Sequence, residues 1–152
     1  MRFILQTEPL DPSALLAGFC AGRTDIGAIV SFTGIARDGA GVTLLDLETY
    51  PALAVRAIEG HMAEARARFE LHDLFAAHRY GQILPGETIV FVAAASKHRR
   101  AAFEASDFLM DALKSQTPFW KKEHGPDGAH WIEPRAEDHA DLARWNKKDQ
   151  MR

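Results

Sequence analysis

The chain has 152 residues, of which 47% are hydrophobic and 26% charged, and its formal net charge is −3. This length favours one domain that buries a core without metal or disulfide support, and the composition excludes an intrinsically disordered chain. The mild acidity argues against general nucleic-acid binding, which needs a broad basic face. The single cysteine, Cys20, cannot form an internal disulfide, so a reducing compartment and a cytoplasmic protein are expected.

The hydrophobic runs of the chain are short. The N-terminal run reaches acidic residues at Glu8 and Asp11, which is too early for a secretory signal. No window has the apolar length of a membrane span. Neither a membrane nor a nucleic acid is therefore expected as a partner.

The first third of the chain predicts a strand, a helix and a second strand. Residues 2–7 (RFILQT) alternate enough between polar and apolar to predict a first strand. Asp11 followed by Pro12 is a typical helix start, and this helix should reach about Cys20. The apolar run Gly27–Thr33 is continuous, so we predict a strand at the centre of a sheet.

The next segments predict a loop, a strand and a long helix. Gly34–Gly41 holds three glycines and is expected to be a loop, and Val42–Tyr50 alternates as a strand. Pro51 opens a helix that should run to about Phe69. Its buried face is predicted to contain Ala54, Ile58, Met62 and Ala65.

The middle of the chain predicts two long strands and a third helix. The strands are expected over Leu71–Tyr80 and Glu87–Ala95, with a turn or loop over Gly81–Gly86 between them. A helix should follow from about His98 to Gln116, because Pro118 forbids its continuation.

The C-terminal part predicts a small hairpin and a polar tail. Two short strands, Phe119–His124 and Ala129–Pro134, flank a GPDG turn. The tail from about residue 137 can begin as a short helix holding Leu142 and Trp145. The whole chain, 1–152, is therefore expected to be a single α+β domain with a mixed or antiparallel sheet, three main helices and a C-terminal β-hairpin.

A basic stretch from Lys97 to Lys122 has a charge balance of +3 inside this acidic chain. Its helix begins with cations, although the partial positive charge of a helix N-terminus normally attracts acids. His98 and Arg99 are therefore candidates for an anion site, where side chains and backbone N–H groups converge on a phosphate or carboxylate. The alternative is a solvated run of charge.

Two lysines in this stretch are candidates for chemistry. Lys114 ends a partly apolar helical stripe, where desolvation would suit it to nucleophilic or general-base work, or it is a helix C-terminal cation favoured by the dipole. Lys121 follows the bend at Pro118 and shares a strand face with Phe119. With nearby aromatics it could hold a planar anionic substrate, or it is an ordinary surface lysine.

Several common site motifs are absent from the sequence. The seven histidines have no metal-ligand spacing, and no Walker A, GxGxxG or GxSxG sequence occurs. We therefore expect neither a metal nor a bound cofactor.

Five segments of the chain form a distinctive set: GAIVSFTGIAR (27–37), LETYP (47–51), PGETIVFVAAASKHRRAAFEA (85–105), DALKSQTPFWKKE (111–123) and WIEPR (131–135). The most specific elements are the K-x-x-x-P-F-W-K sequence and the strand-HR-helix sequence. Together these segments resemble the MoaE family, the large catalytic subunit of molybdopterin synthase, and the similarity extends from Arg2 to about Trp145.

The resemblance implies an α/β-hammerhead type of fold and sulfur transfer in molybdenum cofactor biosynthesis. Enzymes of this family convert cyclic pyranopterin monophosphate (precursor Z) to molybdopterin. The sulfur arrives as a thiocarboxylate on the C-terminal glycine of a small ubiquitin-like partner ending in Gly-Gly, so no separate cofactor is needed. A homodimer of large subunits with one small subunit at each end, a heterotetramer, is implied.

The resemblance also implies roles for individual residues. Lys121 would contact the carbonyl of the partner's C-terminus, and Lys114 would act as acid, base or substrate ligand. Phe32 would form a wall of the pocket, and Ile35 departs from the pattern because many relatives have a basic residue there. The expected anion pocket, in which Arg135 can come from a second copy, contains Arg37, His98, Arg99 and Arg135.

Two other functions remain open at this point. A non-catalytic module could use the same basic pocket to bind an acidic C-terminal tail or a phosphorylated ligand. A phosphate-dependent enzyme of other chemistry would require a bound nucleotide or metal, for which the sequence has no motif.

Overall fold

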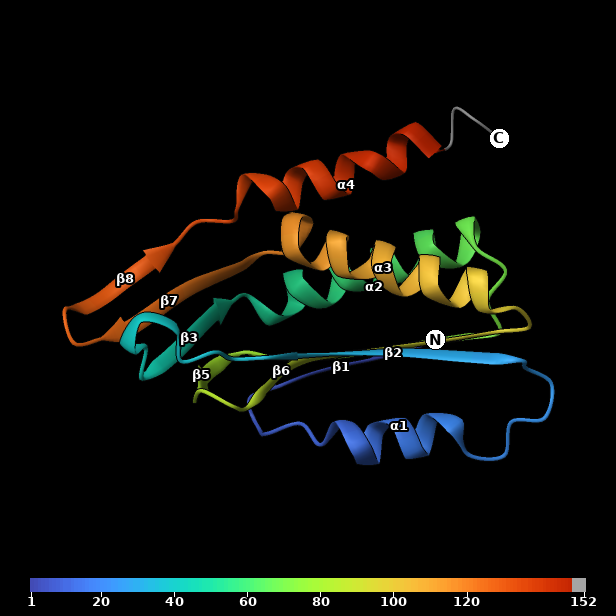
Figure 1. Cartoon of the computed structure of the whole chain (residues 1–152), viewed down its shortest axis with the longest axis horizontal. Helices are drawn as coiled ribbons and strands as arrows, with labels where there is room; N and C mark the ends of the chain where they lie inside the picture. Colours follow the sequence, from blue (N-terminus) through green and yellow to red (C-terminus); the bar gives the residue numbers. More distant parts are fainter. Residues whose placement is uncertain (149–152) are drawn as a thin grey trace.

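The computed structural model describes residues 1–148 and consists of two four-stranded sheets with four α-helices (Figure 1). The last residues of the predicted tail, 149–152, lie outside the described residues. The strands are β1 (Arg2–Gln6), β2 (Ala28–Ile35), β3 (Leu44–Thr49), β4 (Asp73–Arg79), β5 (Gly81–Ile83), β6 (Thr88–Ser96), β7 (Phe119–Gly125) and β8 (Gly128–Ile132). The helices are α1 (Pro12–Cys20), α2 (Pro51–Arg68), α3 (Arg99–Gln116) and α4 (Ala136–Lys148), with a 3-10 turn η1 (Gly39–Gly41).

The first sheet has the strand order β1-β4-β6-β2, with β1 parallel to β4 and the other pairs antiparallel. Its two central strands are buried on both faces. Leu74 and Val92 pack with α2, α3 and Trp145 on one face, whereas Phe75 and Phe91 pack with α1 on the other. Figure 1 shows the same layers, with α1 on one side of the sheet and α2 and α3 on the opposite side.

The position predicted for β2 was wrong. This strand forms an edge of the first sheet and pairs only with β6 within it, and it continues to Ile35, so the predicted loop at 34–41 begins later. Its continuous apolar sequence is therefore not explained by a central position in the sheet. Ile29 packs in the core beside α1, while Val30 and Phe32 line a groove between this strand and α3, so both faces of this edge strand have apolar surroundings.

The second sheet has the order β5-β3-β7-β8 and is antiparallel throughout. A single sheet was expected, and Gly81–Ile83 was predicted to lie in a turn or loop. These residues instead form β5, because Ile83 pairs with Leu45 and is fully buried in a small core. The predicted hairpin of β7 and β8 is confirmed.

Helix boundaries follow the local sequence signals closely. Asp11 caps α1 by accepting the N–H groups of Ser13 and Ala14. In α2, the buried residues are the four that the helical pattern predicted. The tail forms a full helix, α4, whose Trp145 is only 2% exposed and contacts the rings of Phe69 and Phe108.

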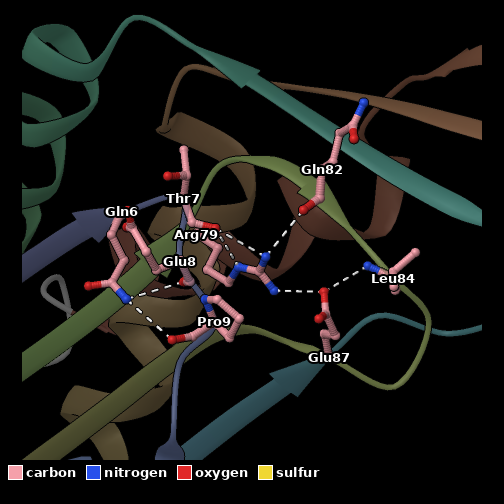
Figure 2. Close-up of polar contacts among 8 residues, drawn as sticks. All are labelled: Gln6, Thr7, Glu8, Pro9, Arg79, Gln82, Leu84 and Glu87. Carbon is pink, nitrogen blue, oxygen red and sulfur yellow. Dashed lines mark hydrogen bonds and ion pairs between the residues drawn. The ribbon is translucent and has the colours of Figure 1, made fainter.

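A buried arginine ties the two sheets to the N-terminal segment (Figure 2). Arg79, at the end of β4, donates to the carbonyl oxygens of Thr7 and Gln82 and pairs with Glu87 at 2.8 Å. Glu87 also accepts the N–H of Leu84, so it closes the turn between β5 and β6. These bonds lower the pKa of the Glu87 carboxyl, the contact with Leu84 contributing most. The junction of the sheets is therefore held by charge-assisted hydrogen bonds.

Candidate functional site

A groove of about 1060 Å³ lies between β2 and the first turns of α3. Phe32 lines one wall, and His98 and Arg99 line the other, so three of the predicted site residues meet here. Phe103 adds an exposed aromatic surface. The groove thus combines apolar walls with a basic end.

The start of α3 has the features expected of an anion site. Among the described residues, His98 is the N-cap residue in an extended conformation and makes no side-chain capping bond, and no acid lies in the first helical turn. Ser96 shapes the turn before it by donating to the carbonyl of Glu70 at 2.7 Å and accepting the N–H of His98 at 3.3 Å. The helix N-terminus therefore keeps its partial positive charge beside cationic side chains.

Backbone packing beneath this turn requires a glycine. A Cβ on Gly27 would lie 2.4 Å from the carbonyl oxygen of Lys97, and the N–H of Gly27 donates to the oxygen of Ser96 at 3.1 Å. The start of β2 is thereby held against the start of α3.

Lys114 and Arg135 are brought together at the other end of α3. Lys114 lies in the last helical turn, with its side chain 58% exposed and its Nζ 3.9 Å from Oδ1 of Asp138. The backbone N–H of Arg135 donates to Oδ2 of the same carboxylate at 3.2 Å. Asp138 therefore connects the Lys114 side chain with the backbone of Arg135, the residue that begins the connection to α4.

Lys121 lies on β7, and its neighbours alternate as predicted. Lys122, on the opposite face, lies 5.0 Å from the ring centre of Trp131. On its own face, Lys121 forms an ion pair with Glu123 at 3.2 Å. Lys121 therefore has a carboxylate partner, and its side chain remains partly exposed to solvent.

The strand that carries Lys121 is fixed to the first sheet through its first residue. Phe119 stacks on the imidazole of His78, with the ring centres 4.1 Å apart. Burial lowers the pKa of His78 to about 4, so the ring is neutral near pH 7, where Nδ1 contacts the carbonyl of Arg79 at 2.7 Å. A neutral, buried ring is a rigid support for Phe119.

Arg37 follows β2 at the same end of the molecule as the hairpin. The preceding residue, Ala36, is buried and exchanges backbone hydrogen bonds with Glu87 and Gly86. Ile35, where many relatives have a basic residue, is exposed. The following turn reaches the hairpin, because Gly41 lies against Pro126.

The seven predicted site residues therefore form two groups within one chain. The elements bearing Arg37, Lys114, Lys121 and Arg135 meet at the hairpin end, whereas Phe32, His98 and Arg99 line the groove at the start of α3 (Figure 1). At about 1.5 Å of rise per residue, Arg99 and Lys114 are about 22 Å apart along the helix. One chain alone does not bring the two groups together.

Two acidic neighbours of the lysines were not singled out from the sequence. Glu123 is two positions after Lys121 and shares its strand face, so alternation could have indicated the pair. Asp138 occupies the third position of α4 and accepts the N–H of Arg135, as in a capping box. Its closeness to Lys114 depends on helix packing, for which the sequence has no local signal.

The described part of the chain offers neither a metal-binding cluster nor a membrane helix. Among residues 1–148, no group of three or more His, Cys, Asp or Glu side chains is placed to hold a metal ion. No helix in the same range is long and apolar enough to cross a membrane.

Comparison with known proteins decides the family. Residues 5–116 match the family model described as "MoaE protein". The chain belongs to the MoaE family. A curated relative, the molybdopterin synthase catalytic subunit of Caulobacter vibrioides, is 51% identical over 149 residues, which cover 97% of this chain and 99% of the relative.

Solved structures agree with this MoaE assignment. The molybdopterin biosynthesis MoaE protein from Burkholderia ambifaria has a TM-score of 0.81 at 42% identity, covering 95% of this chain and 97% of that one. A chain from the complex of subunits 1 and 2 of the Helicobacter pylori molybdopterin-converting factor has a TM-score of 0.74 at 24% identity, covering 88% and 91%, and supports the fold alone. The family, the α+β fold class and the enzyme class expected from the sequence are confirmed.

Proposed function

We propose that this MoaE chain is the catalytic subunit of a molybdopterin synthase and adds sulfur to precursor Z in molybdenum cofactor biosynthesis. The observation that carries the proposal is the near full-length similarity to a molybdopterin synthase catalytic subunit. The lysines and arginines at the hairpin end supply the positive charge that such chemistry needs. A cytoplasmic enzyme fits the single, unpaired Cys20.

The proposed sulfur donor is a small ubiquitin-like partner whose C-terminal Gly-Gly carries a thiocarboxylate. A two-subunit assembly is named for the Helicobacter pylori relative, and its chain has the same fold as this one. Lys121 is partly exposed on β7, so an extended C-terminal tail could reach its ammonium group. Glycines suit a tail that must approach closely, because they have no side chain.

The proposed chemistry uses charge rather than a metal ion or separate cofactor. The thiocarboxylate sulfur would bond to the substrate, and water would then attack the carbonyl carbon of the resulting thioester, so that cleavage of its carbon–sulfur bond leaves the sulfur on the substrate and a carboxylate on the partner. This attack develops negative charge on the carbonyl oxygen, which the ammonium group of Lys121 would stabilise. Lys114 would donate or accept a proton. The arginine side chains, with His98, would bind the substrate phosphate and the carboxyl end of the partner.

A homodimer would complete this site. The two ends of α3 are about 22 Å apart in one chain, which is too far for His98 and Arg99 to act with the lysines of their own chain. We therefore expect them to lie beside the lysines of a second copy. The groove next to them has exposed aromatic walls, Phe32 at 41% and Phe103 at 61%, as expected of a contact surface. With one small subunit at each end, the assembly would be a heterotetramer.

Reconstitution from purified components tests this proposal. The full chain, a thiocarboxylated Gly-Gly partner and precursor Z should yield molybdopterin, detected by mass spectrometry. Lys121→Ala should lower the rate by about 100-fold or more through loss of oxyanion stabilisation. Lys122→Ala is the matched control, because this lysine lies on the opposite strand face and should retain activity.

The alternative function, a non-catalytic binding module, predicts a different outcome. Such a module would capture the partner's tail but leave precursor Z unchanged. Full activity of Lys121→Ala would instead reject the role assigned to this lysine while leaving the enzyme class intact.

A further inference from the structure

We infer that Asp138 is a positioning residue that holds the ammonium group of Lys114 and the Arg135 segment in one arrangement. This inference rests on the proposed sulfur transfer, in which Lys114 takes part. Its basis is a single carboxylate that contacts both segments, with Oδ1 3.9 Å from Nζ of Lys114 and Oδ2 accepting the N–H of Arg135 at 3.2 Å.

The carboxylate itself is well placed to restrain its neighbours. Asp138 is 20% exposed, and its own N–H donates to the carbonyl of Arg135 at 3.1 Å. Both hydrogen bonds to Arg135 fix the start of α4, in the manner of a capping box. The other carboxylate oxygen, Oδ1, takes no part in these two bonds and lies 3.9 Å from Nζ of Lys114.

The helix that bears Asp138 is anchored to the helix that bears Lys114. Asp111, one turn before Lys114, accepts hydrogen bonds from Trp145 Nε1 at 2.7 Å and Arg144 Nη2 at 2.7 Å. Figure 1 shows α4 lying along the outer side of α3. The distance between Asp138 and Lys114 is therefore set by buried contacts and does not depend on the ion pair alone.

A restraint of this kind should affect rate more than stability. Lysine has a long flexible stem, and an ion pair with a 58% exposed lysine contributes little to the free energy of unfolding. Holding the ammonium group near the reacting atoms still reduces the number of unproductive conformations. The effect should appear in kcat and leave KM nearly unchanged.

Three substitutions separate this charge effect from helix capping. Asp138→Asn keeps an oxygen acceptor for the Arg135 N–H but removes the charge, and should lower kcat about 5-fold with KM and Tm nearly unchanged. Asp138→Glu restores a carboxylate and should keep kcat within about 2-fold of the original. Glu137→Gln removes the same charge from the exposed neighbouring position and should leave kcat unchanged.

A second measurement tests the contact without any assay of activity. A carbodiimide joins a carboxylate and an amine as an amide with loss of water, so it should link Asp138 to Lys114 in the full chain. Peptide mass spectrometry should detect this link in the original protein and in Glu137→Gln, but not in Asp138→Asn.

The results distinguish the inference from the function on which it rests. An original protein that makes no molybdopterin rejects the proposed function, and the cross-link then still decides whether Asp138 holds Lys114. An active protein whose kcat is unchanged by Asp138→Asn overturns the inference. So does an equal loss of kcat in Glu137→Gln, or the absence of the cross-link.

Discussion

The indole Nε1 of Trp145 donates to Oδ2 of Asp111 over 2.7 Å, across 34 positions of sequence. Arg144 donates to the same oxygen from Nη2 at 2.7 Å and Nε at 3.1 Å, and the bonds to Asp111 raise the pKa of its guanidinium. One buried carboxylate on α3 thus holds two consecutive residues of α4. The C-terminal helix is part of the folded core.

Asp111→Ala should lower the free energy of unfolding by about 2 kcal/mol, because it removes the acceptor of the buried Trp145 indole N–H and one of the two carboxylates that pair with Arg144. Urea denaturation followed by circular dichroism would measure the change. Asp107→Ala is the control, since Asp107 pairs with the same Arg144 from an exposed position and should cost less than about 1 kcal/mol. Equal losses in the two variants would contradict this account.

Arg79→Met should destabilise the protein by about 2–3 kcal/mol, since the Glu87 side chain is 33% exposed and can be solvated when the guanidinium is removed. The substitution keeps a similar apolar length but leaves Glu87 without its guanidinium partner and the Thr7 and Gln82 carbonyls without a donor (Figure 2). The midpoint of guanidinium chloride unfolding measures the effect. Arg66→Met, on the exposed face of α2, should change stability by less than about 0.5 kcal/mol.

Stability should decline as the pH falls from about 6.5 towards 4, partly because of His78. The unfolded imidazole takes up a proton near its usual pKa of 6.5, whereas the folded one, with its pKa lowered by burial to about 4, does not. Between pH 7.5 and 5, this difference costs about 2 kcal/mol. Burial also lowers the pKa of His61, so this residue should likewise reduce the free energy of unfolding as the pH falls.

His78→Asn should remove most of that pH dependence. Urea titrations at pH 7.5 and 5.0 would measure it, and His72→Asn, at an exposed position, should retain the original dependence. A pH dependence that is identical in both variants would show that another group is responsible.

Two glycines should respond to alanine with opposite signs. Gly27→Ala would place a Cβ 2.4 Å from the Lys97 carbonyl oxygen, which forces β2 away from α3 and should cost about 2 kcal/mol or more. Gly60 lies in the interior of α2, where an added methyl group would meet no neighbour within 4 Å among the described residues, so Gly60→Ala should stabilise by about 0.5–1 kcal/mol. Thermal unfolding of the two variants gives the comparison, and a stabilised Gly27→Ala would be inconsistent with the observed packing.

Mixing two inactive variants should restore activity if the proposed site spans two copies. In a mixed dimer of Arg99→Ala and Lys121→Ala, one of the two sites would receive both residues intact. Random exchange should then recover about a quarter of the original activity, because half of the dimers are mixed and half of their sites are complete. If all site residues acted within one chain, mixing would recover nothing.

Local sequence signals predicted most helices and strands. Pro51 and the apolar spacing of α2 determine its start and its buried face, and the turn glycines after His124 fix the hairpin. Nonlocal pairing was harder to predict. The apolar run of β2 could not reveal an edge position, and Ile83 enters a strand only because it pairs with Leu45.

For the candidate site too, local features could be predicted from the sequence and nonlocal contacts could not. Charge and helix geometry made His98 and Arg99 candidates for an anion site, and family resemblance added Arg37 and Arg135 as further candidates. The sequence placed the helix between His98 and Lys114, but it did not indicate that the expected anion pocket is divided between the two ends of α3. Asp138 could not be found in advance, because its contact with Lys114 depends on how α4 packs on α3.

The stack of Phe119 on His78 has a consequence for how the enzyme responds to heat. Hairpins at the edge of a fold often open before the rest of the molecule does. Here, the strand bearing Lys121 begins on a ring buried in β4, at the middle of the first sheet. Loss of catalytic activity and loss of tertiary structure should therefore coincide on heating, without an earlier stage in which the hairpin alone has melted.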